Sequence, residues 1–184
     1  MRSMLCNPGT AEFCWSDMLA DLRLDALAIP KRHFQTLWDQ GYLKELHQLL
    51  ASNPSTTFQE KLLKSILIYS RHRLTNDPIE KLIFTFSAME ALFLAGNKKV
   101  SIRSTLRRRM SKALYSNDVD QFAFAKTIND AYDLRSEYLH HGIPLNDTRI
   151  VRQFLQHSWL LLLHLIRHQT QWSTLDAYIE DIDT

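Results

Sequence analysis

The chain has 184 residues, 45% of them hydrophobic and 23% charged, and its formal net charge is +2 with histidine neutral. This composition is typical of globular proteins and argues against wholesale disorder and against residence in a membrane. A chain of this length can bury roughly 70% of its unfolded surface, so we expect a self-sufficient core. The net charge is too small to indicate a nucleic-acid-binding protein by itself.

The N-terminal stretch and the cysteines favour a cytoplasmic protein. Cys6 and Cys14 lie near the N-terminus without the spacing of a zinc site or of a disulfide framework, so we expect reduced thiols. The opening MRSMLCNPGTAEFC lacks the basic and then apolar profile of a secretory signal. The longest apolar run, residues 159 to 166, is far shorter than the roughly 20 residues of a membrane helix. We therefore expect a cytoplasmic location and no membrane partner.

The sequence predicts an all-α fold, a helical bundle. It contains four glycines and no Asn-Gly or Asp-Gly turn, and its apolar residues recur at spacings of three and four. A composition change at residues 52 to 54 divides an N-terminal helical pair in residues 1-52 from a helical domain in residues 53-184. Helices are expected near residues 11 to 29, 31 to 51, 57 to 74, 78 to 95, 101 to 115, 118 to 141, 148 to 170 and 174 to 181.

Several of these helices carry start or stop signals. Thr56 with Gln59, and Asp77 with Glu80, have the spacing of a capping box. Gly142 suits the left-handed residue that closes a helix. The signals predict helices that begin after residues 56 and 77 and one that ends at residue 141.

Two charged residues fall within predicted apolar stripes. Glu90 lies in the stripe of the helix near 78 to 95, and Arg135 lies in the stripe that Ile128, Tyr132 and Leu139 form on the helix near 118 to 141. A lone buried charge costs several kcal/mol, so we expect these two side chains to face each other. The pair is either a purely structural ion pair or part of a site.

A histidine follows Arg135 after five positions. His140 lies about 140° from Arg135 around an ideal helix, so the two side chains share no face. They converge only if the helix is ending, if a substrate spans both sides, or if two copies of the chain build the site. The structural alternative is that His140, like His141 beside it, interacts favourably with the dipole at the end of the helix.

Positive charge is concentrated in one segment. Seven lysines and arginines lie between residues 97 and 117 without one acidic residue among them, whereas the C-terminal DAYIEDIDT carries four acids. The basic segment either follows an RNA backbone or is a solvated helix face. The candidates for RNA contacts are Lys98, Lys99, Arg103, Arg107, Arg108 and Arg109.

The stretch YDLRSEYLHHG at residues 132 to 142, with AMEAL at residues 88 to 92 upstream, resembles the Apea-like branch of the HEPN superfamily (higher eukaryotes and prokaryotes nucleotide-binding). The hallmark of that superfamily is an arginine, four to six residues, and a histidine, which here reads Arg135, SEYL and His140. The family glycine usually follows the histidine directly, so His141 is the alternative. The resemblance covers about residues 55 to 172.

The resemblance implies an α-helical, metal-independent endoribonuclease in which a ribose 2'-hydroxyl attacks the adjacent phosphate. Arg135 would stabilise the phosphate charge, His140 or His141 would transfer protons, and Glu90 would orient Arg135, with no metal and no cofactor. It also implies a homodimer in which two motifs line one cleft, and a toxin or defence effector with an antitoxin or defence-system partner. The alternative is a non-catalytic HEPN module that binds RNA, nucleotide or a protein partner.

Overall fold

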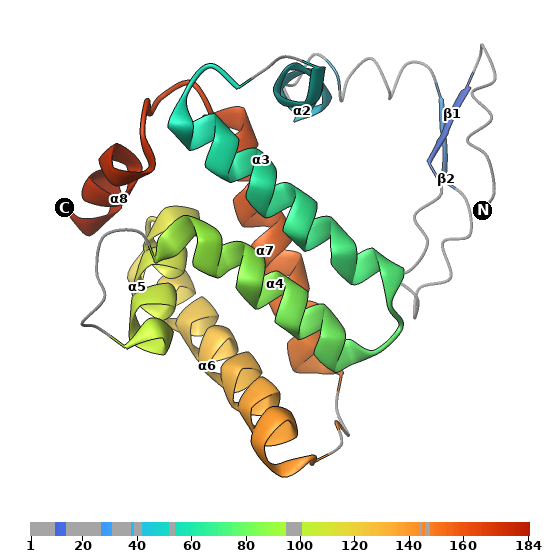
Figure 1. Ribbon diagram of the computed structural model, residues 1–184, viewed down its shortest axis with the longest axis vertical. Coiled ribbons are helices and arrows are strands. Elements are labelled where there is room, and N and C mark those ends of the chain that lie inside the picture. Colours follow the sequence, from blue (N-terminus) through green and yellow to red (C-terminus); the bar gives the residue numbers. More distant parts are fainter. Residues whose placement is uncertain are drawn as a thin grey trace.

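The chain forms a bundle of helices (Figure 1). The computed structural model describes residues 10–13, 27–30, 38, 42–51, 54–94, 101–143, 145 and 148–184. The predicted helical bundle is confirmed, and the helix expected at 118 to 141 has these bounds. The helices are α2 (Tyr42–Ala51), α3 (Thr57–Ser70), the 3-10 helix η2 (Arg71–Leu74), α4 (Pro78–Phe93), α5 (Ile102–Leu114), α6 (Asp118–His141), α7 (Arg149–Arg167) and α8 (Leu175–Asp183).

The N-terminal part differs from the prediction. Strands β1 (Thr10–Phe13) and β2 (Leu27–Pro30) pair in antiparallel register, where a helix near 11 to 29 was expected. That expectation was wrong because it relied on apolar spacing without a capping signal, and such short patterns also fit paired strands. A helix was also expected near residues 31 to 51. Within the described part of that range lies α2. Cys6 and Cys14 lie outside the described residues.

Side chains fix the starts of α3 and α4. Thr56 accepts a hydrogen bond from the backbone N–H of Gln59 at 3.2 Å, as a capping residue does. The Gln59 side chain returns to the backbone N–H of Ser55 at 2.9 Å, one residue before the position that a capping box predicts. The Asp77 carboxylate accepts from the N–H of Ile79 at 2.8 Å. Both predicted helix starts are therefore confirmed.

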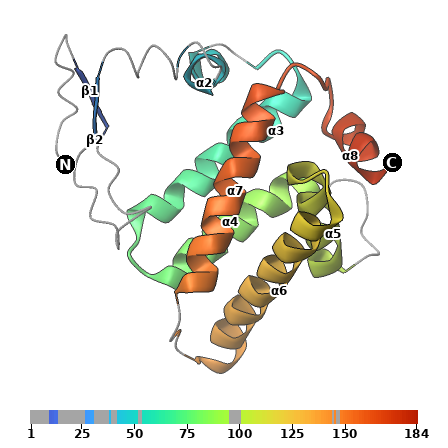
Figure 2. The same cartoon turned by 180° about the vertical axis from the view of Figure 1, so that it is seen from behind.

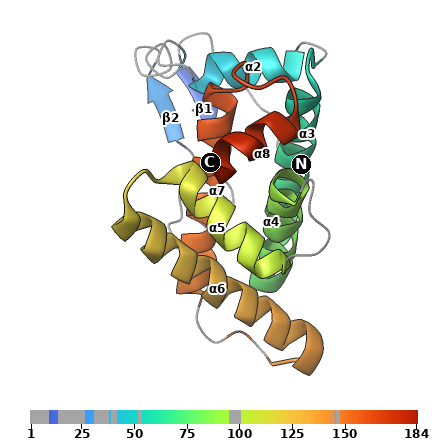
Figure 3. The same ribbon diagram turned by 90° about the vertical axis from the view of Figure 1, so that its left-hand side faces the viewer.

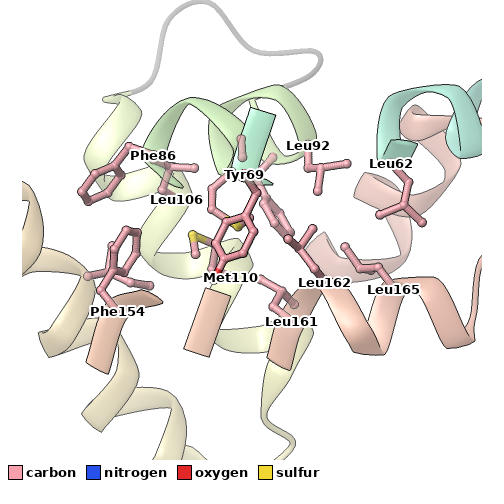
Figure 4. Packing of buried hydrophobic residues seen from close by; sticks show 14 of the residues in the cluster. Leu62, Tyr69, Phe86, Leu92, Leu106, Met110, Phe154, Leu161, Leu162 and Leu165 are labelled. Carbon is pink, nitrogen blue, oxygen red and sulfur yellow. The ribbon is translucent and has the colours of Figure 1, made fainter. Parts of the chain in front are cut away.

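Helix α7 is the centre of the bundle. It packs against α2, α3, α4, α5 and α6, and Figure 2 shows it crossing the antiparallel pair formed by α3 and α4. Figure 4 shows Phe154 of α7 close to Phe86 of α4, and their rings stack at a centroid distance of 4.4 Å. Tyr69 of α3 donates a hydrogen bond to the carbonyl of Leu155 at 2.9 Å. Most of the apolar run in α7 is therefore packed in the core of the bundle.

Helix α2 shares this core. Leu49 belongs to the same buried cluster as the side chains of α3 to α8. The Gln169 side chain donates to the carbonyl of Glu45 at 2.9 Å, which fastens α2 to the end of α7. The boundary at residues 52 to 54 stays a prediction, but the helix before it packs onto the bundle. Within the described residues, the helices are too short or too polar to cross a membrane.

An ion-pair cluster joins α8 to α5, which lie side by side in Figure 3. Arg109 is only 4% exposed, and its guanidinium lies 2.8 Å from Asp183 and donates to the carbonyl of Phe93. Arg108 also contacts Asp183, at 3.1 Å. The hydrogen bonds from Arg109, which have the largest effect, and those from Arg108 hold the pKa of Asp183 below its usual value despite partial burial. The basic and acidic segments of the sequence meet here.

We expect Asp183→Asn to lower the free energy of unfolding by about 2 kcal/mol at neutral pH, because it leaves the buried Arg109 without its carboxylate. A depressed pKa gives stability that is present above the unfolded-state pKa and lost as the pH falls through the folded-state pKa. The difference between variant and wild type should therefore shrink as the pH falls below the ordinary aspartate pKa of about 3.9 and through the lower pKa of the folded state. A series of urea unfolding curves from neutral to acidic pH measures it.

Asp130→Asn is the matched control, because Asp130 pairs with the exposed Lys126 on the surface of α6. It should cost less than about 0.5 kcal/mol. An equal loss in both variants would contradict a special role for the α5–α8 ion pairs.

Candidate functional site

The C-terminal end of α6 projects from the bundle (Figure 1). Residues 137 to 143 are all exposed. Gly142 closes the helix with φ of 63°, and its N–H bonds to the carbonyl of Tyr138 at 2.9 Å, as the sequence predicted. Leu139 is 51% exposed, so the expected buried stripe ends before this turn. The apolar spacing of α6 continues to its end, but its last turns extend beyond the neighbouring helices and are therefore not covered by them.

Arg135 and Glu90 face each other across α6 and α4, as predicted. The Arg135 Nη1 atom lies 3.3 Å from the Glu90 Oε1 atom, and the two side chains are 21% and 26% exposed. The guanidinium also lies over two aromatic rings, 5.5 Å from the centroid of Phe86 and 5.8 Å from that of Tyr132. One carboxylate and two rings therefore restrict the orientation of this cation.

The guanidinium of Arg135 is not saturated by these contacts. Arginine carries five N–H donors, and Nε of Arg135 is buried without a hydrogen-bond partner in the described part of the chain. Leaving a buried donor unpaired costs about 1–3 kcal/mol. Groups held in this state need an explanation beyond packing, and a role in a site is one of them.

Glu90 also borders open space. It lines a cavity of about 480 Å³ with Thr57 and Lys61 of α3, Leu94, and Asp176 near the start of α8. Solvent and small solutes can therefore approach the residue that is paired with Arg135 without passing the end of α6. No sequence signal indicated this cavity, because its residues come from three separate helices.

His140 and His141 occupy the last turn of α6. Both side chains are exposed, and their ring centroids are 6.4 Å apart. The helix stays regular through His141. It therefore does not end early enough to bring either histidine onto the face that carries Arg135. The sequence analysis gave three ways in which Arg135 and a histidine could act together. Two of them remain: a substrate that spans both faces of the helix, and a site built by two copies of the chain.

Arg103 and Arg109 are engaged within the bundle. Arg103 makes a bidentate ion pair with Asp133 of α6 at 2.6 and 2.7 Å, and donates to Asn129 at 3.0 Å. Arg109 is buried against Asp183. The burial of Arg109 leaves little of its guanidinium accessible for the predicted RNA contact. The charge pattern of the sequence did not show which face of α5 packs against α8.

Arg107 and Arg108 are the exposed members of the predicted basic surface. Arg107 lies on the solvent side of α5, and Arg108 is exposed but paired with Asp183. Lys98 and Lys99 lie outside the described residues. A surface that follows an RNA backbone is therefore smaller than the sequence suggested.

Comparison with known proteins identifies no family for this chain. No protein-family model, no curated protein and no solved structure matches it. Over the described ranges, no group of three or more histidine, cysteine, aspartate or glutamate side chains is placed to hold a metal ion. The chemistry of the site is therefore inferred from its own residues.

A double-mutant cycle should show that Glu90 and Arg135 interact energetically. We expect Glu90→Gln and Arg135→Met to have non-additive effects on the free energy of unfolding, with a coupling of about 0.5–2 kcal/mol, because the pair is three-quarters buried. Chemical denaturation of the four proteins measures it. The same cycle on the exposed pair of Lys126 and Asp130 should give less than about 0.5 kcal/mol. Strict additivity at Glu90 and Arg135 would contradict the pair.

Proposed function

We propose that the chain is a metal-independent endoribonuclease of the HEPN type. The observation that carries the proposal is the placement of Arg135 on α6, where it is paired with Glu90 and lies beside two aromatic rings. The same helix ends in the exposed His140 and His141. An oriented cation and a proton-transfer group are the two parts that cleavage of an RNA phosphodiester requires. The RNA substrate and the role as a toxin or defence effector belong to this proposal.

The reaction uses an imidazole and a guanidinium. The imidazole of His140 or His141 takes the proton of a ribose 2'-hydroxyl, whose oxygen attacks the adjacent phosphorus. The bond to the 5'-oxygen breaks as that oxygen receives a proton from the imidazolium, which returns the histidine to its neutral form. Histidine suits this step because its ordinary pKa of about 6.5 lies near neutrality. Such a base is typically worth about 10² to 10⁴ in rate.

Arg135 stabilises the charge that grows on the phosphate oxygens. Its planar guanidinium can contact two oxygens at once. Glu90 and the two rings hold the guanidinium in place before the substrate arrives, which avoids reorganisation during the reaction. Glu90 is thus a positioning residue, and it touches no reacting atom in this scheme.

A second copy of the chain completes the site in this proposal. Within one copy the regular α6 keeps Arg135 and the histidines on different faces. Tyr138, Leu139 and Ile143 are exposed apolar residues at the same helix end, which two copies could bury together. Arg135 of one copy would then act with a histidine of the other in one cleft. Arg107 and Arg108 would guide the RNA backbone toward it.

The second candidate is a non-catalytic HEPN module that binds RNA, nucleotide or a protein partner. The observation that favours it is the burial of Arg135, which is 21% exposed and already paired with Glu90. In that case the ion pair only stabilises the contact of α4 with α6. The two candidates differ in whether the exposed histidines have a chemical task.

We expect the purified protein to cleave single-stranded RNA in the presence of EDTA and to leave 2',3'-cyclic phosphate ends. Arg135→Ala should abolish cleavage, and only one of His140→Ala and His141→Ala should do so, which identifies the base. His47→Ala is the control, since His47 is an exposed histidine on α2. Circular dichroism checks that each variant is folded. Full cleavage by Arg135→Ala, or a strict need for divalent metal, would contradict the mechanism.

Mixing two inactive variants should restore activity if the site is shared between copies. Equal amounts of Arg135→Ala and the inactive histidine variant should recover about a quarter of the wild-type rate after subunit exchange, because half of the dimers are mixed and each has one intact site of two. Single-turnover cleavage measures it. An inactive mixture, with dimers verified by light scattering, would mean that each site belongs to one copy.

A further inference from the structure

Two histidines lie one turn apart at the C-terminal end of α7. His164 is exposed, and His168, the residue that caps the helix, is half-buried. The N–H of His168 donates to the carbonyl of His164 at 3.2 Å, so the turn between them is helical. Figure 2 shows α7 running from the side of the bundle where α6 ends toward α2. This pair is therefore separate from the proposed ribonuclease site at the end of α6.

The two imidazole rings have the spacing that a shared metal ion requires. Residues four apart on a helix lie on the same face, and the ring centroids of His164 and His168 are 4.6 Å apart. A metal ion lies about 2.1 Å from an imidazole nitrogen and hence about 3.2 Å from the ring centroid. Two rings on one ion then have centroids about 4.5 Å apart at a right angle and about 5.2 Å apart at the tetrahedral angle. Rotation of the two side chains can therefore bring one nitrogen of each ring onto a common ion.

Gln171 restricts the ring of His168. Its side-chain amide nitrogen lies 2.9 Å from Nδ1 of His168. A half-turn of the amide presents its oxygen instead, which accepts the Nδ1–H and leaves the lone pair of Nε2 for an ion. Metal-binding histidines usually have such a partner on their second nitrogen, and it orients the ring. This contact favours a metal site independently of the spacing between the two rings.

The ligand atoms determine which ions fit. Imidazole suits divalent transition metals such as Zn²⁺, Cu²⁺ and Ni²⁺, whereas Mg²⁺ and Ca²⁺ prefer oxygen ligands. Arg167 in the same turn is exposed and adds a positive charge, so coordination rather than charge attraction would hold the ion. Over the described residues, no group of three histidine, cysteine or carboxylate side chains forms here, so water would fill the other coordination positions.

We propose that His164 and His168 together bind one divalent transition-metal ion, which fastens the last turn of α7. Their spacing is that of the two zinc ligands in the HExxH motif, but the chain reads HLIRH and lacks the glutamate that acts as a base there. The ion therefore has a structural role. It holds His168 directly before Gln169, whose side chain fastens α7 to α2. No step of RNA cleavage involves this ion, so removing it with EDTA leaves the proposed ribonuclease reaction intact.

Calorimetric titration of the full chain with Ni²⁺ tests the two ligands. His164→Ala and His168→Ala should each bind one Ni²⁺ ion fewer per chain than the wild type, or bind it at least about tenfold more weakly, because a single imidazole cannot chelate. His47→Ala is the control, since His47 is an exposed histidine of α2 without another histidine four residues away. Mg²⁺ should show no saturable binding. Unchanged Ni²⁺ binding in either α7 variant would overturn the proposal.

Variants of Gln171 test how the ring of His168 is held. Gln171→Leu should weaken Ni²⁺ binding about tenfold, because it removes the partner of Nδ1 and keeps both ligands. Gln171→Glu should bind Ni²⁺ at least as tightly as the wild type, since a carboxylate also accepts the Nδ1–H. Equal affinities in the leucine and glutamate variants would count against the proposed coordination through Nε2.

Unfolding in urea separates a metal site from a simple helix end. Ni²⁺ should raise the urea midpoint of the wild type and of His47→Ala, because an ion that binds only the folded chain stabilises it. It should leave the midpoint of His164→Ala unchanged. An equal rise in the wild type and in His164→Ala would place the ion elsewhere in the chain and would overturn the proposal, whatever the RNA assays show.

Discussion

The ring of Phe86 connects the core of the bundle with its candidate site. It stacks on Phe154 of the central helix α7 and also lies beneath the guanidinium of Arg135. A close-packed interior gives such a ring little freedom, because neighbouring side chains fill the space on every side. The position of the cation is therefore determined by the same packing that brings α4 onto α7. The position of the Arg135 guanidinium therefore depends more on the packing of the core than on the conformation of its own side chain.

The ion pairs of α5 show how charge is used in this chain. Arg103 ties α5 to α6 through Asp133, and Arg109 ties it to α8 through Asp183. Arginine suits both places because its rigid fork matches a carboxylate with two parallel hydrogen bonds. Within the described part of this basic segment, two arginines thus hold α5 to α6 and to α8, and their charge is already paired with carboxylates.

Most of the helical bundle could be predicted from the sequence because its signals are local. Capping residues such as Thr56 and Asp77, and the glycine at residue 142, act on the backbone beside them and leave a direct pattern. The pairing of Glu90 with Arg135 was also predictable, since a charge within an apolar stripe needs a partner. In contrast, the burial of Arg109 and the cavity beside Glu90 depend on which helices meet, and no local pattern encodes that. The strands β1 and β2 were missed for a similar reason, because each is stabilised by its partner.

Gly142 constrains where the histidines of α6 can point. Among the described residues, no atom lies within 4 Å of where a Cβ atom at this position would stand, so the φ of 63° is the feature that favours glycine. A β-branched residue would disfavour the left-handed turn and favour continuation of the rod. His140 and His141 would then no longer lie in the last turn of the helix. Their backbone carbonyl groups would accept hydrogen bonds from the added helical residues. The place where the two imidazoles leave the helix thus depends on the backbone torsion angle of a single glycine.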